Sequence, residues 1–470
     1  MNLKRKIAHN TIIQLGGKIV STFLGLLAVF IMIRGLGAEK FGWYTTAVGF
    51  LQFIGIFSDF GFMITSANML SEPNFDKEKL LNTLFSWRLL TAAVFQGLAP
   101  LLFLFFPYPP EIKMAVGITA ISFFAISISQ VFSGYYQMQL KTQIVTIGEL
   151  LGRVVLVISA FMLTRNSADF LYFMIAISVA SVINASYLFY KMPKLKISFE
   201  KDITKEIFSR IWPTALCIIF NSFYLQGDRV ILPLYTSQVQ VGFYGAAYRV
   251  LDIIIQMAAL IMGIISPLLA FFWSRQQKGD FNKFLQIAFD LMSLVLLPLM
   301  AGAVALSEPI MQFIGGNQFV GAGKILIWLS WTILGICFGI VFGYTALAIN
   351  KQKQAVWIYA SDAILSIIGY FIFIPRFGIY GAAGVTIFSE LFAGLMLMML
   401  VFHFSSFYLR TKSLFKILLA TIIMYIVVKS FPLPNVILSI ALGGMVYTTL
   451  ILLFKIISKE TIREIMQPTN

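Results

Sequence analysis

The chain has 470 residues, of which 59% are hydrophobic and only 12% are charged. A soluble domain carries about a quarter charged residues because its surface faces water, so this composition excludes a soluble protein and predicts a surface that faces hydrocarbon. The net charge of +15 does not indicate nucleic-acid binding, because the basic residues lie in short loops between apolar runs, where they indicate topology and anionic headgroup contact.

Apolar runs long enough to cross a membrane recur along the whole chain. A transmembrane helix needs about 20 mostly apolar residues to cross a hydrocarbon core roughly 30 Å thick, and about fourteen such helices are predicted here. The first six are residues 7–33, 41–64, 80–106, 112–136, 144–163 and 170–190. The remaining eight are residues 212–235, 241–271, 284–305, 325–349, 355–374, 381–402, 414–428 and 436–457.

Loop charge sets the orientation of these helices. With the N-terminus inside, roughly 23 Lys and Arg lie in cytoplasmic segments and about 7 lie outside. We therefore expect an inner-membrane protein with both termini in the cytoplasm. The basic linker at 191–210 follows six helices, so an all-α fold with two six-helix bundles in parallel repeat is predicted. The bundles comprise residues 1–200 and 201–404, and residues 405–470 hold helices thirteen and fourteen and a cytoplasmic tail.

A short motif recurs where external turns lead into helices. Residues 41–44 read Phe-Gly-Trp-Tyr, residues 241–247 read Val-Gly-Phe-Tyr-Gly-Ala-Ala, and residues 377–383 read Phe-Gly-Ile-Tyr-Gly-Ala-Ala. Glycine permits a tight turn and tyrosine anchors a helix at the membrane interface, which would explain a single copy. Recurrence at equivalent topological positions indicates internal duplication.

Basic residues inside the predicted helices are the candidates for substrate binding, because a charge in hydrocarbon is costly and faces a cavity or an opposite charge. They are Lys18, Arg88, Arg153 and Arg249. A hydrated cationic cavity for an anionic headgroup is one interpretation, and salt bridges that lock helices together are the other. Glu149 and Arg153, and likewise Arg249 and Asp252, have the spacing of helix neighbours. Lys18 has no acid three or four residues away, which favours function.

Acidic residues inside the helices are the candidates for coupling transport to H⁺ or Na⁺. The four candidates are Asp59, Asp252, Asp362 and Glu390. Asp362 and Glu390 have no basic neighbour on their own helices, and an intramembrane carboxylate of this kind suits a cation pathway. A carboxyl group hydrogen-bonded to a neighbouring helix is the alternative interpretation.

Several chemistries are absent from the sequence. No Gly-rich phosphate loop followed by Lys and Ser or Thr is present, so ATP hydrolysis is not expected. His9 and His403 are the only histidines and no metal-ligand spacing occurs, so neither a metal nor another cofactor is expected. Cys217 and Cys337 lie in apolar runs and are expected to be free thiols. Polar segments of at most about 20 residues are too short for a catalytic domain, and no cleavable signal peptide is expected.

Five stretches, in this order and spacing, carry a family resemblance. Residues 34–44 read Arg-Gly-Leu-Gly-Ala-Glu-Lys-Phe-Gly-Trp-Tyr and residues 59–62 read Asp-Phe-Gly-Phe. Asp-Arg-Val-Ile-Leu at 228–232 and Gly-Phe-Tyr-Gly-Ala-Ala-Tyr-Arg at 242–249 follow, and the motif at 377–383 comes last. Together they resemble the polysaccharide biosynthesis or O-antigen flippase family of the multidrug, oligosaccharidyl-lipid and polysaccharide exporter superfamily.

The resemblance implies two bundles around a V-shaped cavity that opens alternately to the two sides of the membrane. It implies a polyprenyl-pyrophosphate-linked glycan as substrate, an ion gradient or membrane potential as driver, and a glycan polymerase or glycosyltransferases as partners beside the membrane lipids. Basic residues on helices one and eight line the cavity in related flippases, and Lys18 and Arg249 occupy such places here, with Lys replacing the commoner Arg. Helices thirteen and fourteen resemble an additional pair beside which a lipid tail passes.

Two other functions remain open from the sequence. A drug or metabolite antiporter of the same superfamily would favour an acidic and aromatic cavity for cations, whereas the candidate cavity here is basic. A membrane-embedded glycan polymerase or glycosyltransferase would expose a substantial catalytic loop, which the short loops do not provide.

Overall fold

The computed structural model describes residues 3–62, 66, 69–70, 72, 75–192 and 194–455, with only the backbone described for 3–15 and for a few positions between 213 and 225. Its regular elements are α-helices and one short 3₁₀ helix. Parts of the sequence predictions lie outside this description. They are the ends of the second and fourteenth predicted helices, the tail from residue 456, and the side chains of His9 and Cys217.

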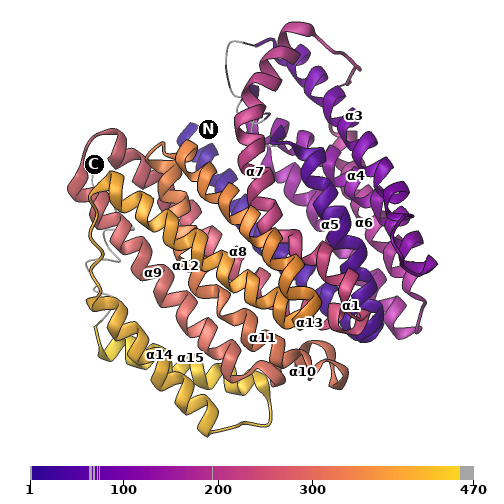
Figure 1. The fold of residues 1–470 in the computed structure, drawn as a ribbon. Coiled ribbons are helices and arrows are strands. Elements are labelled where there is room, and N and C mark those ends of the chain that lie inside the picture. Colours follow the sequence, from indigo (N-terminus) through magenta and orange to yellow (C-terminus); the bar gives the residue numbers. More distant parts are fainter. Residues whose placement is uncertain are drawn as a thin grey trace. The chain divides into compact units, whose positions relative to one another are not determined.

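The chain divides into two compact units, Met1–Gly242 and Phe243–Asn470. Figure 1 shows their helices along the chain. The first unit contains α1 (Leu3–Asp59), α3 (Lys77–Phe103), α4 (Pro110–Met138), α5 (Thr142–Arg165), α6 (Phe170–Tyr190) and α7 (Lys201–Tyr235). Helix α8 (Gln238–Ser274) begins in the first unit and continues into the second. The second unit also contains α9 (Lys278–Ala305), α10 (Ser307–Gly315), α11 (Ala322–Ser330), α12 (Thr332–Ala348), α13 (Gln352–Ser405), α14 (Lys412–Ser430) and α15 (Val436–Leu453).

Two of these helices each consist of two segments that meet at a glycine. Helix α1 breaks at Gly37 (φ 71°) and α13 breaks at Gly378 (φ 56°). Both glycines have a positive φ, which other residues rarely adopt. The candidate span Gly16–Asp59 has 44 residues and would measure about 66 Å at 1.5 Å per residue, enough for two crossings. Among the described residues eleven helices are long and apolar enough to cross a membrane, and the all-α multi-pass prediction is confirmed.

The repeated motif forms a reciprocal contact inside the first unit. A Cβ atom on Gly42 would overlap the carbonyl oxygen of Gln238, and a Cβ atom on Gly242 would overlap the carbonyl oxygen of Ala38. Each motif glycine therefore meets the residue four positions before the other. The Thr46 hydroxyl also donates to Gln238 Oε1 at 2.9 Å. In these two copies glycine permits a close helix approach rather than a tight turn.

The first segment of α1 packs side by side with α5, and the two run parallel. The matched pairs keep an offset of 128 or 129 residues and are Gly17 with Thr146, Gly25 with Arg153, and Gly35 with Thr164. Beyond Gly37, Lys40 Nζ lies 3.3 Å from Asp169 Oδ1. Asp169 also caps α6 by accepting from the backbone N–H of Phe170. These two interactions lower the pKa of Asp169, the capping hydrogen bond more strongly.

Helices α12 and α13 of the second unit cross at a short distance. A Cβ atom on Gly394 would lie 2.7 Å from the carbonyl oxygen of Gly335, and one on Gly335 would lie 2.7 Å from Cβ of Glu390. Small residues permit such approaches between helices in a membrane, where packing replaces the hydrophobic effect as the driving force. Glu390 thus lies at this close approach of the two helices. In the same unit α14 packs against α9 and α15.

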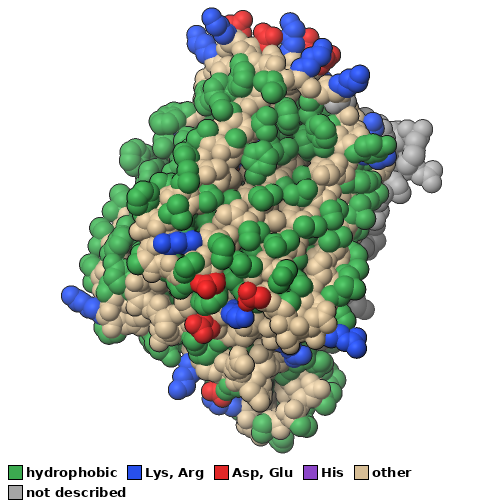
Figure 2. All heavy atoms as spheres, turned by 90° about the vertical axis from the view of Figure 1, so that its right-hand side faces the viewer, with side chains coloured by type: hydrophobic (Ala, Val, Ile, Leu, Met, Phe, Trp, Pro, Cys, Tyr) green, Lys and Arg blue, Asp and Glu red, His purple; other side chains and the backbone are tan. Residues whose placement is uncertain are grey.

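Large apolar side chains remain exposed along the helices of the first unit. Figure 2 shows hydrophobic side chains over a broad band on the side of α4 and α6, with charged side chains gathered at its upper end and in its lower part. Ile121, Ile175 and Val179 are exposed by 54%, 43% and 45%. Water would disfavour such a surface, and the hydrocarbon of a bilayer does not.

Replacing Gly394 with alanine is expected to destabilise the second unit, because the new methyl group meets the backbone of Gly335, which cannot move aside cheaply. Overpacking of this kind costs about 1–3 kcal/mol, and we expect a lower Tm for the purified protein in detergent. Gly384→Ala is the matched control, since a Cβ atom there meets nothing within 4 Å. Equal Tm values for the two variants would contradict the proposed packing.

Candidate functional site

Two predicted substrate-binding cations of the first unit lie along the α1–α5 pair. Lys18 is exposed on α1 and has no ion-pair partner among the described residues. The guanidinium carbon of Arg153 on α5 lies 3.2 Å from the position that a Cβ atom on Gly25 would take. Gly25 follows Lys18 by seven residues, which is two helical turns and about 10 Å on the same face. The two cations therefore follow one side of α1.

Arg153 does not form the intrahelical ion pair that its spacing allows. The described residues include Glu149, but no oxygen of it lies within 4.0 Å of a nitrogen of Arg153. Arg153 itself is exposed. Its charge is thus available to a ligand, which the alternative of a locking salt bridge would not allow.

Arg88 occupies a different environment, because all three of its nitrogens contact other parts of the first unit. The side chain is only 2% exposed. Nε donates to the Ser127 carbonyl at 3.0 Å, Nη1 donates to the Ser58 carbonyl at 2.6 Å, and Nη2 donates to Gln130 Oε1. Nη2 also lies 3.0 Å from Asp59 Oδ1. Arg88 therefore ties α3 to the end of α1 and to α4.

The charge at the end of α1 suits this arrangement. Ser58 is the residue before the last of the helix, so its carbonyl lies in the final turn, where carbonyl groups lack intrahelical donors and the helix dipole is negative. A buried cation there satisfies a carbonyl group and the Asp59 carboxylate together. The sequence showed Arg88 and Asp59 separately, and the structure pairs them.

The predicted pairing on α8 is confirmed. Arg249 Nη1 lies 3.1 Å from Asp252 Oδ2, and the side chains are 20% and 24% exposed. A partly exposed pair retains some contact with water, so the cation can approach a ligand without leaving its partner. Arg249 thus combines features of both interpretations, since it is paired and still accessible.

The two acidic candidates on α13 lie in a buried polar strip of the second unit. Asp362 belongs to the first segment of α13 and is fully buried. Ser389 of the second segment donates to Asp362 Oδ2 at 2.9 Å, and Ser366 donates to Asp362 Oδ1 at 3.3 Å. Glu390 follows Ser389 and is 7% exposed. The hydrogen bonds thus connect the two segments on either side of Gly378.

Three hydroxyl groups extend this strip. Thr386 Oγ1 lies 3.2 Å from the Tyr370 hydroxyl and 3.4 Å from the Tyr244 hydroxyl of α8. The Thr386 hydroxyl donates to the Ala382 carbonyl at 3.0 Å. These hydroxyl residues were not predicted from the sequence. A signal was present, because polar residues recur every four positions at 362, 366 and 370 within an apolar run.

No metal centre is evident in the part of the chain that the structure describes, where no group of three or more His, Cys, Asp or Glu side chains could hold an ion. Asp362 instead has two hydroxyl partners, an arrangement that suits one proton or one monovalent cation. Cys337 is buried and forms no disulfide with a described residue.

The arrangement of helices defines a multi-pass transporter fold. The lipid II flippase MurJ in an inward closed conformation superposes with a TM-score of 0.79 at 17% identity, covering 94% of this chain and 98% of that chain. An inward-facing multidrug resistance MATE family transporter of the MOP superfamily gives a TM-score of 0.67 at 13% identity, covering 84% and 98%. At these identities the likeness concerns the fold alone.

The sequence then gives the family. Residues 7–273 match the family described as polysaccharide biosynthesis protein, and the chain belongs to that family. The resemblance seen in the sequence motifs is thereby confirmed. A relative from Haloferax volcanii, described as a probable low-salt glycan biosynthesis flippase Agl15, is 23% identical over 286 residues. The aligned stretch covers 59% of this chain and 61% of that protein.

Replacing Arg88 with methionine is expected to lower the free energy of unfolding by about 3–5 kcal/mol, because Asp59 and the Ser58 carbonyl would lose their buried partner. The measurement is thermal or denaturant unfolding of purified protein in detergent. Adding Asp59→Asn should recover part of the loss, since the unpaired charge is then removed.

Arg165→Met serves as the control for the loss of one positive charge, because Arg165 is exposed at the end of α5. A fall in stability as large as that of Arg88→Met would show that net charge, rather than the buried contacts, causes the effect.

Proposed function

We propose that this protein is a flippase that moves a polyprenyl-pyrophosphate-linked oligosaccharide from the cytoplasmic to the outer leaflet by alternating access. The observation that carries the proposal is the family match over residues 7–273, which includes all four basic candidates. The description of the Haloferax volcanii relative as a glycan biosynthesis flippase supports the same class of substrate. The protein acts as a transporter in this proposal and catalyses no covalent reaction.

Lys18 and Arg153 of the first unit and Arg249 of the second are each proposed to contact the headgroup in the course of transport. A pyrophosphate carries several negative charges, and charge-assisted hydrogen bonds to it are stronger than neutral ones. Lys18 supplies a point charge, whereas the guanidinium groups can grip two oxygens at once. Arg88 is assigned a supporting role, because its donors are engaged within the first unit.

The membrane orientation forms part of the proposal. Positive residues concentrate in the segments that would face the cytoplasm, the linker at 191–210 above all, and such a bias retains loops on that side. Both termini would then lie in the cytoplasm and the protein in the plasma membrane. Glycosyltransferases that build the lipid-linked glycan would act before transport, and a polymerase or ligase that consumes it would act afterwards.

The energy source is proposed to be a gradient of H⁺ or Na⁺, with Asp362 and Glu390 as the coupling carboxylates. Both are nearly or fully buried in the polar strip of α13. Asp59 and Asp252 are ion-paired with arginines and are less suited to exchange a cation with the solvent. Moving one elementary charge through 100 mV supplies about 2.3 kcal/mol, which would shift a two-state equilibrium by roughly fiftyfold.

A drug or metabolite antiporter is the second candidate, favoured by the likeness to a multidrug transporter fold. The sign of the accessible charges separates the two. Lys18 and Arg153 would attract an anionic headgroup and repel a cationic drug. A glycan polymerase is disfavoured by the short polar segments.

Lys18→Ala and Arg249→Ala are expected to slow transport about 10- to 100-fold, because each removes a charged hydrogen bond worth roughly 1.5–3 kcal/mol. The measurement is flipping of a fluorescent polyprenyl-pyrophosphate-linked sugar in proteoliposomes, with the amount of inserted protein determined in parallel. Normal flipping by the double variant would exclude the proposed headgroup site.

Asp252→Asn is the matched control for Arg249, because it breaks the 3.1 Å ion pair and keeps the cation. Substrate binding predicts that flipping survives Asp252→Asn better than Arg249→Ala. Equal losses, together with reduced protein in the membrane, would instead identify the pair as structural.

Glu390→Gln and Asp362→Asn are expected to uncouple flipping from the gradient, because the amides imitate the neutral carboxyl group and cannot exchange a cation. Flipping is measured with and without an imposed H⁺ gradient, Na⁺ gradient and potential. The unmodified protein should respond to at least one of them, and the variants should not. Asp280→Asn, which alters an exposed carboxylate at the start of α9, should leave the response intact. An unmodified protein that ignores every gradient would refute the coupling proposal.

A further inference from the structure

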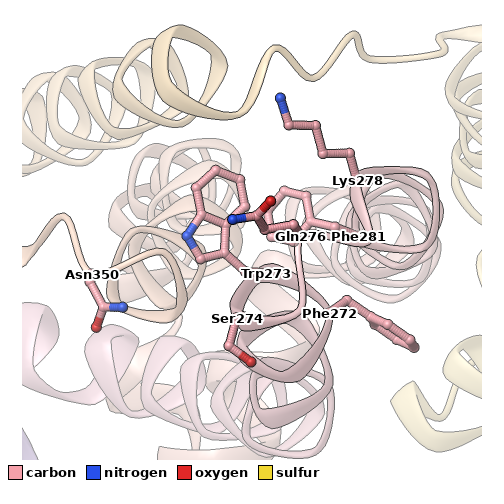
Figure 3. Close-up of a pocket in the computed structure, with 7 residues that line it drawn as sticks. All are labelled: Phe272, Trp273, Ser274, Gln276, Lys278, Phe281 and Asn350. Atoms are coloured by element: carbon pink, nitrogen blue, oxygen red, sulfur yellow. The ribbon is translucent and has the colours of Figure 1, made fainter.

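A pocket of about 340 Å³ lies at one end of the second unit, where the turn between α8 and α9 meets the turn after α12. Figure 3 shows its lining. The rings of Trp273 and Phe281, with centroids 5.1 Å apart, form an apolar base. Gln276 also lines the pocket, and Asn350 and Lys278 stand on different sides of it. Its volume is at the lower end of small-molecule sites, which span about 300–1,000 Å³.

The polar groups at the rim of this pocket are mainly unused donors. The side chains of Gln276, Lys278 and Asn350 have no hydrogen-bond or ion-pair partner within the described part of the chain. Lys has three donors and no acceptor, and the side-chain amides add N–H groups. Ser274 differs, because its hydroxyl donates to the Phe271 carbonyl at 2.9 Å. No carboxylate lines the pocket.

The surrounding sequence is strongly basic. Residues 275–283 and 351–353 hold five cations and one carboxylate, namely Arg275, Lys278, Lys283, Lys351, Lys353 and Asp280. The guanidinium of Arg275 lies 4.0 Å from the ring centre of Phe271, and Lys351 Nζ lies 3.9 Å from that of Phe404. Both cations thus lie over the faces of aromatic rings, in cation–π contacts.

The C-terminal ends of α8 and α12 oppose anion binding, but weakly. Each end closes with a residue of positive φ, Gln276 at 58° and Asn350 at 59°. The N–H of Gln277 bonds the Phe272 carbonyl at 3.0 Å and that of Lys351 bonds the Ala346 carbonyl at 2.8 Å. These carbonyls are satisfied, and the negative potential of a helix C-terminus decays within a turn. The excess of four positive charges around the pocket therefore outweighs that negative potential.

We propose that this pocket binds the phosphodiester headgroup of an anionic phospholipid. The unused donors and the basic rim suit the phosphate oxygens, and the Trp273 and Phe281 rings suit the glycerol and the first carbons of the chains. The pocket lies at helix ends, where the membrane interface is expected. A lipid-linked oligosaccharide would exceed the pocket, so the site is separate from that of the proposed transport substrate. In the proposed orientation the lipid belongs to the cytoplasmic leaflet.

The test is a titration of purified protein in detergent with phosphatidylglycerol or phosphatidylcholine, followed by native mass spectrometry. Lys278→Gln should weaken binding of phosphatidylglycerol about fivefold, the effect of about 1 kcal/mol per basic residue at an anionic membrane surface. Asn350→Gly should weaken it further, because glycine keeps the positive φ and loses the amide. Lys353→Gln, which removes an equal charge beside the pocket without lining it, should bind like the unmodified protein.

Three results would overturn the proposal. Equal affinity for phosphatidylcholine would show that the pocket does not select an anionic headgroup. An equal loss of phosphatidylglycerol affinity in Lys353→Gln and Lys278→Gln would show that general surface charge, not the pocket, causes the binding. Displacement of the lipid by millimolar glycerol phosphate would identify a site for a soluble phosphate instead. A Tm equal to that of the unmodified protein within the error of measurement checks that the variants are folded, and Gln276→Gly offers a second deletion at a positive φ if one is not.

Discussion

The absence of water from the bilayer core is the constraint on which the rest of the structure depends. A polar group there must find its partner inside the protein. Backbone groups find theirs within helices, and side chains must reach another helix or their own carbonyls. Arg88 reaches two carbonyl groups and a carboxylate, while Asp362 reaches two hydroxyls. Helix positions are therefore determined by polar partners as well as by apolar packing.

Most of the helical framework could be predicted from the sequence, because length and hydropathy alone decide whether a segment can span a membrane. The Arg249–Asp252 pair was also predictable, since both partners lie on one helix. Arg88 was not, because its partners come from two other helices and two of them are backbone carbonyls. Spacing cannot reveal a partner that carries no distinctive side chain. For Arg153 the spacing was misleading in the opposite way, because it allowed an ion pair with Glu149 that the structure does not contain.

The polar strip of α13 illustrates a similar limit. Ser366, Thr386 and Ser389 are common residues of membrane helices, where such hydroxyls usually bond a carbonyl one turn earlier. Only the fold at Gly378 brings the two segments together, and with them the hydroxyls and Asp362. The two acidic residues alone suggested a coupling role. The surrounding hydroxyls explain how Asp362 is held in an apolar bundle without a cation within two turns on its own helix.

The reciprocal contact of Gly42 and Gly242 has a consequence for how the chain can change over evolutionary time. Duplicated segments normally drift apart, because each copy answers to its own surroundings. Here each copy of the motif contacts the other, and both glycines lie at the same close approach of the two helices, one on each side. Substitutions at the two glycines are therefore coupled, because an added methyl group on either side would push the two helices apart.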